Sequence, residues 1–344
     1  MYSWEERQGT LHIEKSDMDG AVPEGFYSTT NYPTYVFWKD QWVLVEKQRM
    51  DALIVKEGDR FVCKKLRDIF QGDEILMGDE GICVKTPEER MEDKSFKFMD
   101  SNVSSEKRNE LLIRDLAHKL VAEGKKLTVV CGPAIVHTGA NIYLADLIAK
   151  GYVRALLAGN AVAVHDMEKS FFNTSLGVNA DTGQLAKDGY RNHMRAINRI
   201  KRAGSIQNAV DQGILTSGIM YALTKYHVPY VLAGSLRDDG PLPETKMNMI
   251  DAQTAYDHHL RRSDIVVVLS TMLHGIASGN MLPYEIPMYC VDISSNVVTK
   301  LSDRGSAQSI GIVTDVGLFL RLLQLEINDQ EAKRDQAQKD QDPA

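Results

Sequence analysis

Five apolar runs in the last two thirds of the chain each end in a short cluster of small, polar or charged residues. The clusters are Cys131-Gly132-Pro133, Ala158-Gly159-Asn160, Ala233-Gly234-Ser235, Ser270-Thr271 and Val291-Asp292. Open α/β sheets bind ligands at the carboxyl ends of their parallel strands, so clusters of this kind are expected to lie together around a ligand. The pattern predicts a cofactor-dependent enzyme whose site is lined by successive strand tips.

Apolar strands alternate with helical patterns from about residue 104 onwards. Strands are expected at 127–136, 153–158, 229–234, 264–270, 287–292 and 310–314, with helices between them. Strands rich in Val, Ile and Leu that alternate with helices form parallel sheets covered on both faces. The predicted fold class is therefore α/β, with a doubly wound, mostly parallel Rossmann-like sheet in residues 96–327.

Three other regions have their own patterns. Residues 1–95 contain short alternating segments separated by turn residues, which predicts a small, mostly β domain. Residues 173–190 are a long polar stretch between helices, as is typical of lids and binding loops. Residues 328–344 are rich in Gln, Asp and Lys and almost free of apolar residues, which predicts a disordered polar tail.

Charge and cysteine content exclude several functional classes. The 344 residues carry a formal net charge of −7, which provides no basic surface for nucleic acid or an anionic membrane. The sequence has no apolar run long enough to span a membrane and no basic leader at its start, so we expect a cytoplasmic protein. The four cysteines lie far apart, which indicates neither a zinc site nor a disulfide framework, and we expect no bound metal.

A phosphate site is expected without the usual glycine fingerprint, because G-x-G-x-x-G is absent from the sequence. The segment 158–166 instead gives a strand end, a Gly159-Asn160 turn and a helix whose first N–H groups can bind a phosphate. A tight strand-to-helix turn alone would give the same pattern. Asp292 and Asp315 close two further strands, where a carboxylate can accept ribose hydroxyls or cap the next helix.

The segment 234–243 gathers both signs of charge directly after an apolar strand. Arg237, Asp238 and Asp239 lie there between glycines and prolines. A loop that presents a cation together with carboxylates suits an amino acid, with Arg237 on the substrate carboxylate and an aspartate on an ammonium or a ribose.

Histidines follow three of the expected strands. His137, His165 and His274 occupy these positions, and Asp166 beside His165 is a candidate proton acceptor. A hydrogen-bonded structural role is the alternative for each histidine taken alone.

Longer motifs in the same region resemble the archaeal and cyanobacterial type of ornithine cyclodeaminase. This family is also described as the LOR/SDH conserved region family, after lysine-oxoglutarate reductase/saccharopine dehydrogenase. The matching motifs include GPAIVHTG at 132–139, AGNAVAVHDME at 158–168, VLAGSLRDDGPLP at 231–243, TMLHGIASGNMLP at 271–283 and VDI at 291–293. The resemblance covers roughly 105–325 strongly and the first domain more loosely.

The resemblance implies an NAD-binding domain similar to the deoxyhypusine synthase type, which lacks the glycine fingerprint. In such a domain NAD is held at positions matching Asn160, Ala161, Asp239, Thr271, Met272, Leu273, His274, Asp292, Asp315 and Val316. Most of these positions are strand tips that the residue pattern had already indicated.

The family reaction, in proline biosynthesis and arginine metabolism, converts L-ornithine into L-proline and ammonia. Bound NAD takes a hydride from the substrate, an imine forms and cyclises, and the same cofactor then reduces the cyclic imine. Such an enzyme must deprotonate an ammonium, hold a carboxylate and keep water from the imine. The candidates are His137, His165 or Asp166 for proton transfer and Arg237 for the carboxylate. We also expect a homo-oligomer.

Two alternatives stay open at this point. The first is an NAD-dependent dehydrogenase or imine-forming enzyme that acts on another amino acid or a diamine. The second is a non-catalytic sensor of NAD or an amino acid, with the β domain as a partner-binding module. Formation of proline and ammonia without accumulation of NADH would distinguish the cyclodeaminase from both.

Overall fold

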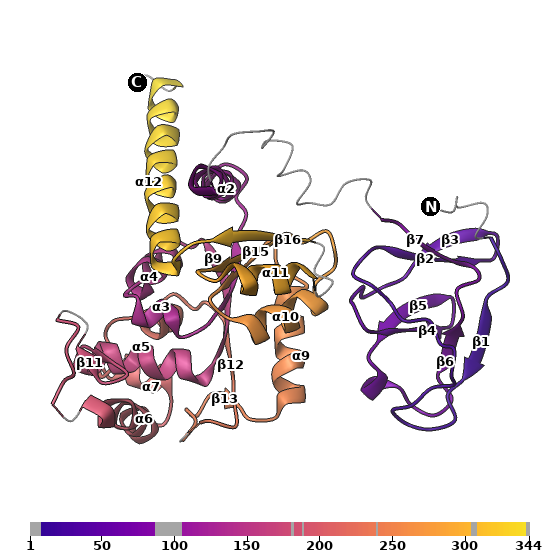
Figure 1. Ribbon diagram of the computed structural model, residues 1–344, viewed down its shortest axis with the longest axis horizontal. Helices are drawn as coiled ribbons and strands as arrows, with labels where there is room; N and C mark the ends of the chain where they lie inside the picture. Colours follow the sequence, from indigo (N-terminus) through magenta and orange to yellow (C-terminus); the bar gives the residue numbers. More distant parts are fainter. Residues whose placement is uncertain are drawn as a thin grey trace.

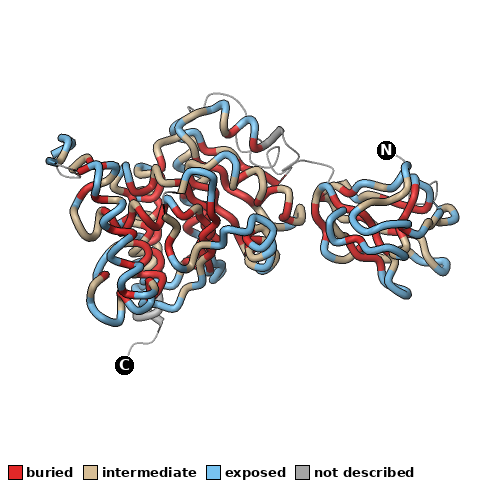
Figure 2. Tube along the Cα trace, turned by 90° about the horizontal axis from the view of Figure 1, so that it is seen from below, coloured by how far each residue is buried: buried red, intermediate tan, exposed pale blue. Residues whose placement is uncertain are grey.

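The computed structural model describes residues 8–86, 105–179, 182–187, 189–238, 240–303 and 308–341. It contains a β-rich domain and an α/β domain, and each has its own core of buried side chains (Figures 1 and 2). Our predicted boundary at residue 95 falls between residues 86 and 105, outside the described residues.

Two antiparallel sheets form the β-rich domain, as its alternating segments predicted. One sheet has the order β1-β6-β4-β5 and the other the order β3-β2-β7. The elements are β1 (His12–Lys15), β2 (Thr34–Trp38), β3 (Gln41–Leu44), β4 (Leu53–Glu57), β5 (Arg60–Lys64), η1 (Leu66–Asp68), β6 (Glu74–Met77) and β7 (Ile82–Val84). Val36, Ile54, Phe61 and Leu76 lie in one buried cluster, which holds the sheets together.

A parallel sheet of seven described strands forms the centre of the α/β domain, which confirms the predicted fold class. Its order is β13-β12-β9-β8-β14-β15-β16. The strands are β8 (Leu127–Cys131), β9 (Val153–Gly159), β12 (Tyr230–Ala233), β13 (Thr245–Lys246), β14 (Ile265–Leu269), β15 (Met288–Asp292) and β16 (Ser309–Val313). The chain runs outward from β8 to β12 and then returns to β14 on the other side of β8, so the direction of winding reverses between β8 and β14.

Helices cover both faces of this sheet (Figure 1). Side chains of the first face share one buried cluster with α2 (Ser105–Val121), α4 (Asn141–Ala149), α5 (Asn160–Phe172), α6 (Asn192–Ala203), α7 (Ile206–Asp211), α8 (Ile219–Lys225) and α12 (Val316–Gln341). The opposite face packs against α9 (Met249–Leu260), α10 (Met272–Met281) and α11 (Ser295–Asp303). No helix in the described part of the chain is both long and apolar enough to cross a membrane.

The polar stretch after α5 contains a small antiparallel hairpin. Its strands are β10 (Thr174–Ser175) and β11 (Val178–Asn179), and η2 (Gly189–Arg191) leads into α6. The short helix α3 (Ala134–His137) follows β8 directly, so β8 ends at Cys131 and not at residue 136 as we expected. Pro133 lies at the N-cap of α3, where proline is tolerated, whereas it cannot donate to a ladder in a central strand.

The end of the chain differs from the predicted disordered tail. Helix α12 continues to Gln341 and extends beyond the sheet (Figure 1). Glu331 anchors this extension, since it accepts hydrogen bonds from Tyr152 Oη at 2.6 Å and Lys150 Nζ at 2.9 Å. Lys333 also pairs with Asp329 one turn away at 2.6 Å. Polar residues with good helix propensity therefore extend a helix whose earlier turns are packed.

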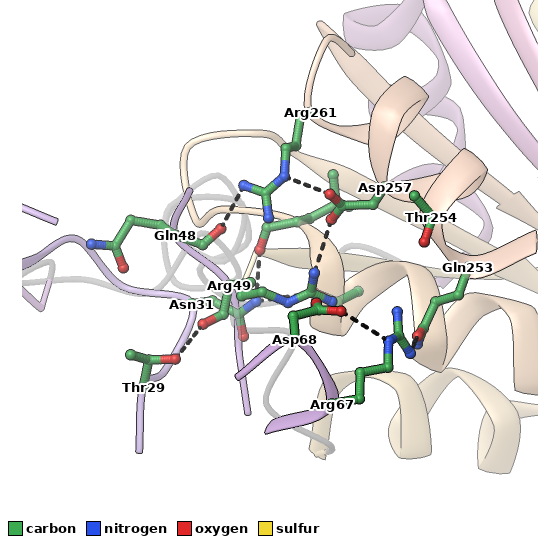
Figure 3. Close-up of polar contacts among 12 residues, drawn as sticks. Thr29, Asn31, Gln48, Arg49, Arg67, Asp68, Gln253, Thr254, Asp257 and Arg261 are labelled. Atoms are coloured by element: carbon green, nitrogen blue, oxygen red, sulfur yellow. Dashed lines mark hydrogen bonds and ion pairs between the residues drawn. The ribbon is translucent and has the colours of Figure 1, made fainter. Parts of the chain in front are cut away.

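The β-rich domain contacts α9 and α10 through hydrogen bonds and ion pairs (Figure 3). Arg49 donates to Asp257 of α9 at 3.1 Å, and Arg261 binds the other oxygen of the same carboxylate at 2.8 Å. Asn31 Nδ2 donates to the carbonyl oxygens of Gly279 and Leu282 at the carboxyl end of α10, at 3.0 and 2.6 Å. The two helices that cover the second face are thus fixed to the β-rich domain.

Candidate active site

The strand tips meet at the point where the winding of the sheet reverses. Gly132 follows β8 there, and a Cβ atom on this residue would overlap the carbonyl oxygen of Ser270 at the tip of β14. Ser270 has a φ of 48°, a left-handed conformation that is unusual for a residue with a side chain. Such strain is typical of functional loops, and α/β sheets bind ligands where the winding reverses. We call the region just outside these strand tips the crevice.

The amino end of α5 faces this crevice. Gly159 is its N-cap, with an extended backbone (φ −80°, ψ 158°) and no side-chain cap, so the first N–H groups of the helix are left for a ligand. The Asn160 side chain is used inside the protein, because Oδ1 accepts from Leu242 N at 3.0 Å and Thr245 Oγ1 at 2.8 Å. Ala161 is exposed. A ligand at this end of α5 would therefore meet the backbone of Asn160 and Ala161 and not the Asn160 side chain.

His274 lies beside Gly159 in the first turn of α10. A Cβ atom on Gly159 would lie 3.8 Å from Cε1 of His274 and 3.9 Å from its Nε2. Thr271 is the N-cap of this helix and also lacks a side-chain cap. Met272 and Leu273 are 41% and 74% exposed, so this turn presents apolar side chains at the rim of the crevice.

Asp292 and Asp315 lie at neighbouring strand tips as predicted, and each caps the backbone that follows it. Asp292 Oδ1 accepts from Ser294 N at 2.8 Å, and Asp315 Oδ1 accepts from Leu318 N at 2.9 Å. The capping interpretation therefore accounts for one oxygen of each carboxylate. Val316 is buried below the crevice.

His137 and His165 lie together, although they come from different helices. Their ring centroids are 5.1 Å apart in an edge-to-face arrangement. His137 Nδ1 contacts Ser175 Oγ of the hairpin at 2.6 Å. Burial, followed by the neighbouring His165, lowers the pKa of His137, so its imidazole is neutral at neutral pH.

A cavity of about 340 Å³ is lined by His137, the outer member of this pair of histidines. It is bounded by the segment from Val136 to Gly139 on one side and by the hairpin residues Ser175 to Asn179 on the other, with Lys169 between them. The polar stretch that we predicted as a lid therefore forms one wall of the cavity. Its volume is adequate for a small amino acid.

Glu168 connects His165 to the hairpin. Its fully buried carboxylate accepts from His165 Nδ1 at 3.0 Å, from Thr174 Oγ1 at 2.9 Å, and from the backbone N–H groups of Leu176 and Gly177 at 3.2 and 3.1 Å. Burial raises the pKa of Glu168, but these hydrogen bonds outweigh burial and hold the pKa below its ordinary value. An ionised carboxylate only accepts, so Nδ1 of His165 carries the proton and Nε2 is the basic nitrogen.

Asp166 does not join this cluster, contrary to our expectation. It faces the interior, where Oδ2 accepts from Met220 N at 2.8 Å at the start of α8 and Oδ1 accepts from Asn141 Nδ2 at 3.4 Å. Burial raises the pKa of its carboxyl to about 6. Since successive residues of a helix point in different directions, Asp166 caps α8 while His165 faces the hairpin.

The loop after β12 keeps one exposed cation. Arg237 is exposed, and its guanidinium makes no hydrogen bond with any residue that the structure describes. Asp238 shapes the loop, since Oδ2 accepts from Ser235 N at 2.7 Å and Oδ1 accepts from Asn160 Nδ2 at 3.3 Å. Asp239 lies outside the described residues.

Comparison with protein families accounts for most of the chain. Residues 112–323 match the C-terminal Rossmann-fold region of arginine dihydrolase ArgZ-like proteins, and residues 33–113 match the first C-terminal region of the same proteins. The chain belongs to the ArgZ-like family. It is 48% identical over 324 residues to the ornithine cyclodeaminase of Methanocaldococcus jannaschii, covering 91% of this chain and 77% of that protein.

Three further proteins, one bifunctional enzyme and two solved structures, are similar to this ArgZ-like chain. It is 46% identical to the bifunctional arginine dihydrolase/ornithine cyclodeaminase ArgZ of Synechocystis, covering 91% of this chain and 46% of ArgZ. A LOR/SDH protein from Methanococcus maripaludis superposes with a TM-score of 0.86 at 44% identity, over 94% of this chain and 99% of that one. The complex of AgrE with ornithine and NAD+ superposes with a TM-score of 0.63 at 43% identity, over 95% of this chain and 47% of AgrE.

Sequence reasoning missed two residues that contact the candidate histidines. Glu168 follows His165 by three positions on one helix, a spacing that brings side chains together and that could have revealed it. Tyr256 binds His274 Nδ1 from α9. Tyr256 and His274 are 18 positions apart, and nothing in the sequence links them.

Proposed function

We propose that this protein is an ornithine cyclodeaminase, which converts L-ornithine into L-proline and ammonia with NAD as its resident cofactor. The observation that carries the proposal is the 48% identity to an ornithine cyclodeaminase along almost the whole chain. The strand-tip crevice and the adjacent pair of histidines support it, because the reaction needs a redox cofactor and proton transfer at one place.

The crevice fits a dinucleotide in three respects. Gly159 leaves the backbone bare at the tip of β9, the amino end of α5 has no side-chain cap, and α10 presents exposed apolar side chains beside these tips. The residues that would hold NAD are the backbone of Asn160 and Ala161, the turn from Thr271 to His274, and Asp292, Asp315 and Val316 at neighbouring tips. NAD, when bound, supplies an acceptor and donor of hydride within one turnover.

His165 is the residue we propose as the proton acceptor for the substrate ammonium. The ionised Glu168 fixes the Nδ1–H form of His165, so its Nε2 carries a free lone pair next to His137. His137 is neutral at neutral pH and is our candidate for passing the proton on. Asp166 is not assigned a part in proton transfer, because its carboxylate caps α8.

Arg237 remains our candidate for binding the substrate carboxylate. Its guanidinium is exposed in the loop after β12, and a bidentate pair with a carboxylate would use both of its parallel N–H donors. The hairpin wall of the cavity carries Leu176 and Val178, apolar side chains that help to keep water from a reactive imine.

Stoichiometry tests the proposal directly. Protein incubated with L-ornithine and a trace of NAD+ should form proline and ammonia in equal amounts, with no net NADH. In a second reaction with NAD+ in excess over ornithine, NADH that accumulates in proportion to the ornithine consumed would instead identify a plain dehydrogenase. Binding of NAD without turnover of ornithine, lysine or diamines would identify a sensor, and either result would refute the proposal.

A further inference from the structure

Three elements meet at the hydroxyl group of Tyr256. This buried side chain comes from α9, and its Oη lies 2.9 Å from the carbonyl oxygen of Ala158 in β9. The same Oη lies 2.9 Å from Nδ1 of His274 in α10. The hydroxyl therefore connects the carboxyl end of β9, a central strand, to the histidine beside Gly159.

Counting protons assigns each hydrogen bond a direction. The Tyr256 hydroxyl has one proton, and the carbonyl of Ala158 can only accept, so Tyr256 donates to Ala158. Its oxygen must then accept from His274, which places the proton of that imidazole on Nδ1. If Tyr256 donated to His274 instead, two oxygen atoms would face each other at 2.9 Å with no proton between them.

The opposite nitrogen of His274 is therefore an uncharged acceptor. Burial lowers the pKa of His274, so the ring is neutral at neutral pH. Its Nε2 makes no hydrogen bond within the described part of the chain, and it lies on the side of the ring next to Gly159. A lone pair is thus presented at the strand tips, next to the uncapped end of α5.

Tyr256 is held firmly enough to set this arrangement. The next residue of α9, Asp257, is bound by Arg49 of the β-rich domain and by Arg261, as Figure 3 shows. Asn31 of the same domain holds the carboxyl end of α10, the helix that carries His274. The β-rich domain therefore fixes both helices that bring Tyr256 and His274 together.

We propose that Tyr256 is a positioning residue that fixes His274 as its Nδ1–H tautomer, so that Nε2 accepts a hydrogen bond from a ligand in the crevice. The ligand group is an O–H or N–H donor, either a ribose hydroxyl of the dinucleotide or the ammonium of the amino acid. The identity of this ligand rests on the proposed function, whereas the tautomer itself does not.

Solid-state NMR of protein labelled with ¹³C and ¹⁵N in histidine reads the tautomer without any ligand or turnover. The His274 signals are those lost in the H274Q variant. We expect wild-type His274 to carry its proton on Nδ1, and Tyr256→Phe to produce a second population protonated on Nε2. A wild-type His274 protonated on Nε2 would overturn the proposal even if the variant failed to fold.

A double-mutant cycle tests whether Tyr256 acts through His274. In the wild-type background we expect Y256F to weaken NAD affinity or raise the KM for ornithine by about threefold to tenfold, the effect of one hydrogen bond. A change in NAD affinity identifies the ribose hydroxyl as the donor, and a change in KM alone identifies the ammonium. In the H274Q background Y256F should have no further effect, and equal effects in both backgrounds would overturn the proposal.

Tyr289→Phe is the matched control. Tyr289 is also buried, and its hydroxyl binds Lys119 at 3.0 Å and Asp115 at 3.3 Å on the opposite face of the sheet. Its loss should leave the His274 tautomer and both affinities unchanged. A His274 response to Y289F equal to that of Y256F would show that loss of any buried tyrosine hydroxyl suffices, and would refute the assignment.

Discussion

Replacing Glu168 with glutamine tests whether the hairpin and His165 are coupled through one carboxylate. Oε1 of Glu168 accepts from Thr174 and Gly177, and Oε2 accepts from His165 and Leu176. Glutamine has nearly the same shape but replaces one oxygen with an N–H₂ group. If the amide oxygen takes the position of Oε1, the donors of His165 and Leu176 face another donor.

The expected losses follow from these bonds. A hydrogen bond to a charged group contributes about 1.5–3 kcal/mol, so loss of the Leu176 bond should lower the free energy of unfolding by about 1.5 kcal/mol or more. His165 avoids the clash by moving its proton to Nε2, which removes the lone pair that we assign to the substrate ammonium. General-base catalysis contributes about 10²–10⁴-fold, so kcat should fall by about a hundredfold or more.

Proline formation at saturating ornithine measures kcat, and urea unfolding measures stability. The matched control is Glu74→Gln, which alters a partly exposed carboxylate paired with Lys56 in the β-rich domain and should leave kcat unchanged. If E168Q kept kcat within threefold of the wild type, the carboxylate would not set the state of His165, and the reasoning would be refuted.

Three further predictions concern the buried Asp166, the two glycines at the strand tips, and the junction between the domains. Because burial raises the pKa of Asp166 to about 6, the folded state binds this proton more tightly than the unfolded state, and stability falls as pH rises from about 4 to about 6. This change in the free energy of unfolding is about 3 kcal/mol, and Asp166→Asn should remove it. Urea unfolding at several pH values measures it, and a pH dependence that persists in the variant would contradict the assignment. Gly132→Ala should destabilise the protein by about 1–3 kcal/mol, because the new methyl group would overlap Ser270. The methyl group of Gly159→Ala would meet its nearest atoms at 3.8 Å, so this variant should keep wild-type stability in thermal unfolding but weaken NAD binding. Arg49→Met should cost about 2 kcal/mol of unfolding free energy, because Asp257 loses one of its two cationic partners, and equal urea midpoints would show that the domain junction contributes nothing.

The sheet was predictable because its strands carry their signal locally. The expected segment 287–292 agrees to within one residue with the observed strand Met288–Asp292. A short apolar run between a proline and a polar residue is typical of a buried strand, which explains the agreement. The two failures arose where local signals were weak. Pro133 ends β8 earlier than its apolar run suggests, and α12 continues through polar residues whose partners, Lys150 and Tyr152, lie far away in the sequence.

The candidate site was predictable at its strand tips and not in its supporting contacts. His137, His165 and His274 could be placed near strand tips from the sequence, because each follows an apolar strand and a strand tip has a fixed place in this fold. Asp166 was misjudged because its partner is the backbone N–H of Met220, 54 positions later. Tyr256 could not be found, because its partners are a backbone carbonyl and a histidine that only the folded sheet brings near.

Helix α5 joins the two halves of the site into one rigid unit. Its uncapped amino end lies next to His274, and further along the same helix His165 packs against His137 and Lys169 lines the cavity. With a rise of about 1.5 Å per residue, His165 lies about 7.5 Å along the axis from Asn160. A ligand at the start of the helix and an amino acid beside His165 would therefore be close neighbours without any movement between domains. The β-rich domain can then serve a fixed role, holding α9 and α10 beside the crevice, while the hairpin forms one wall of the cavity.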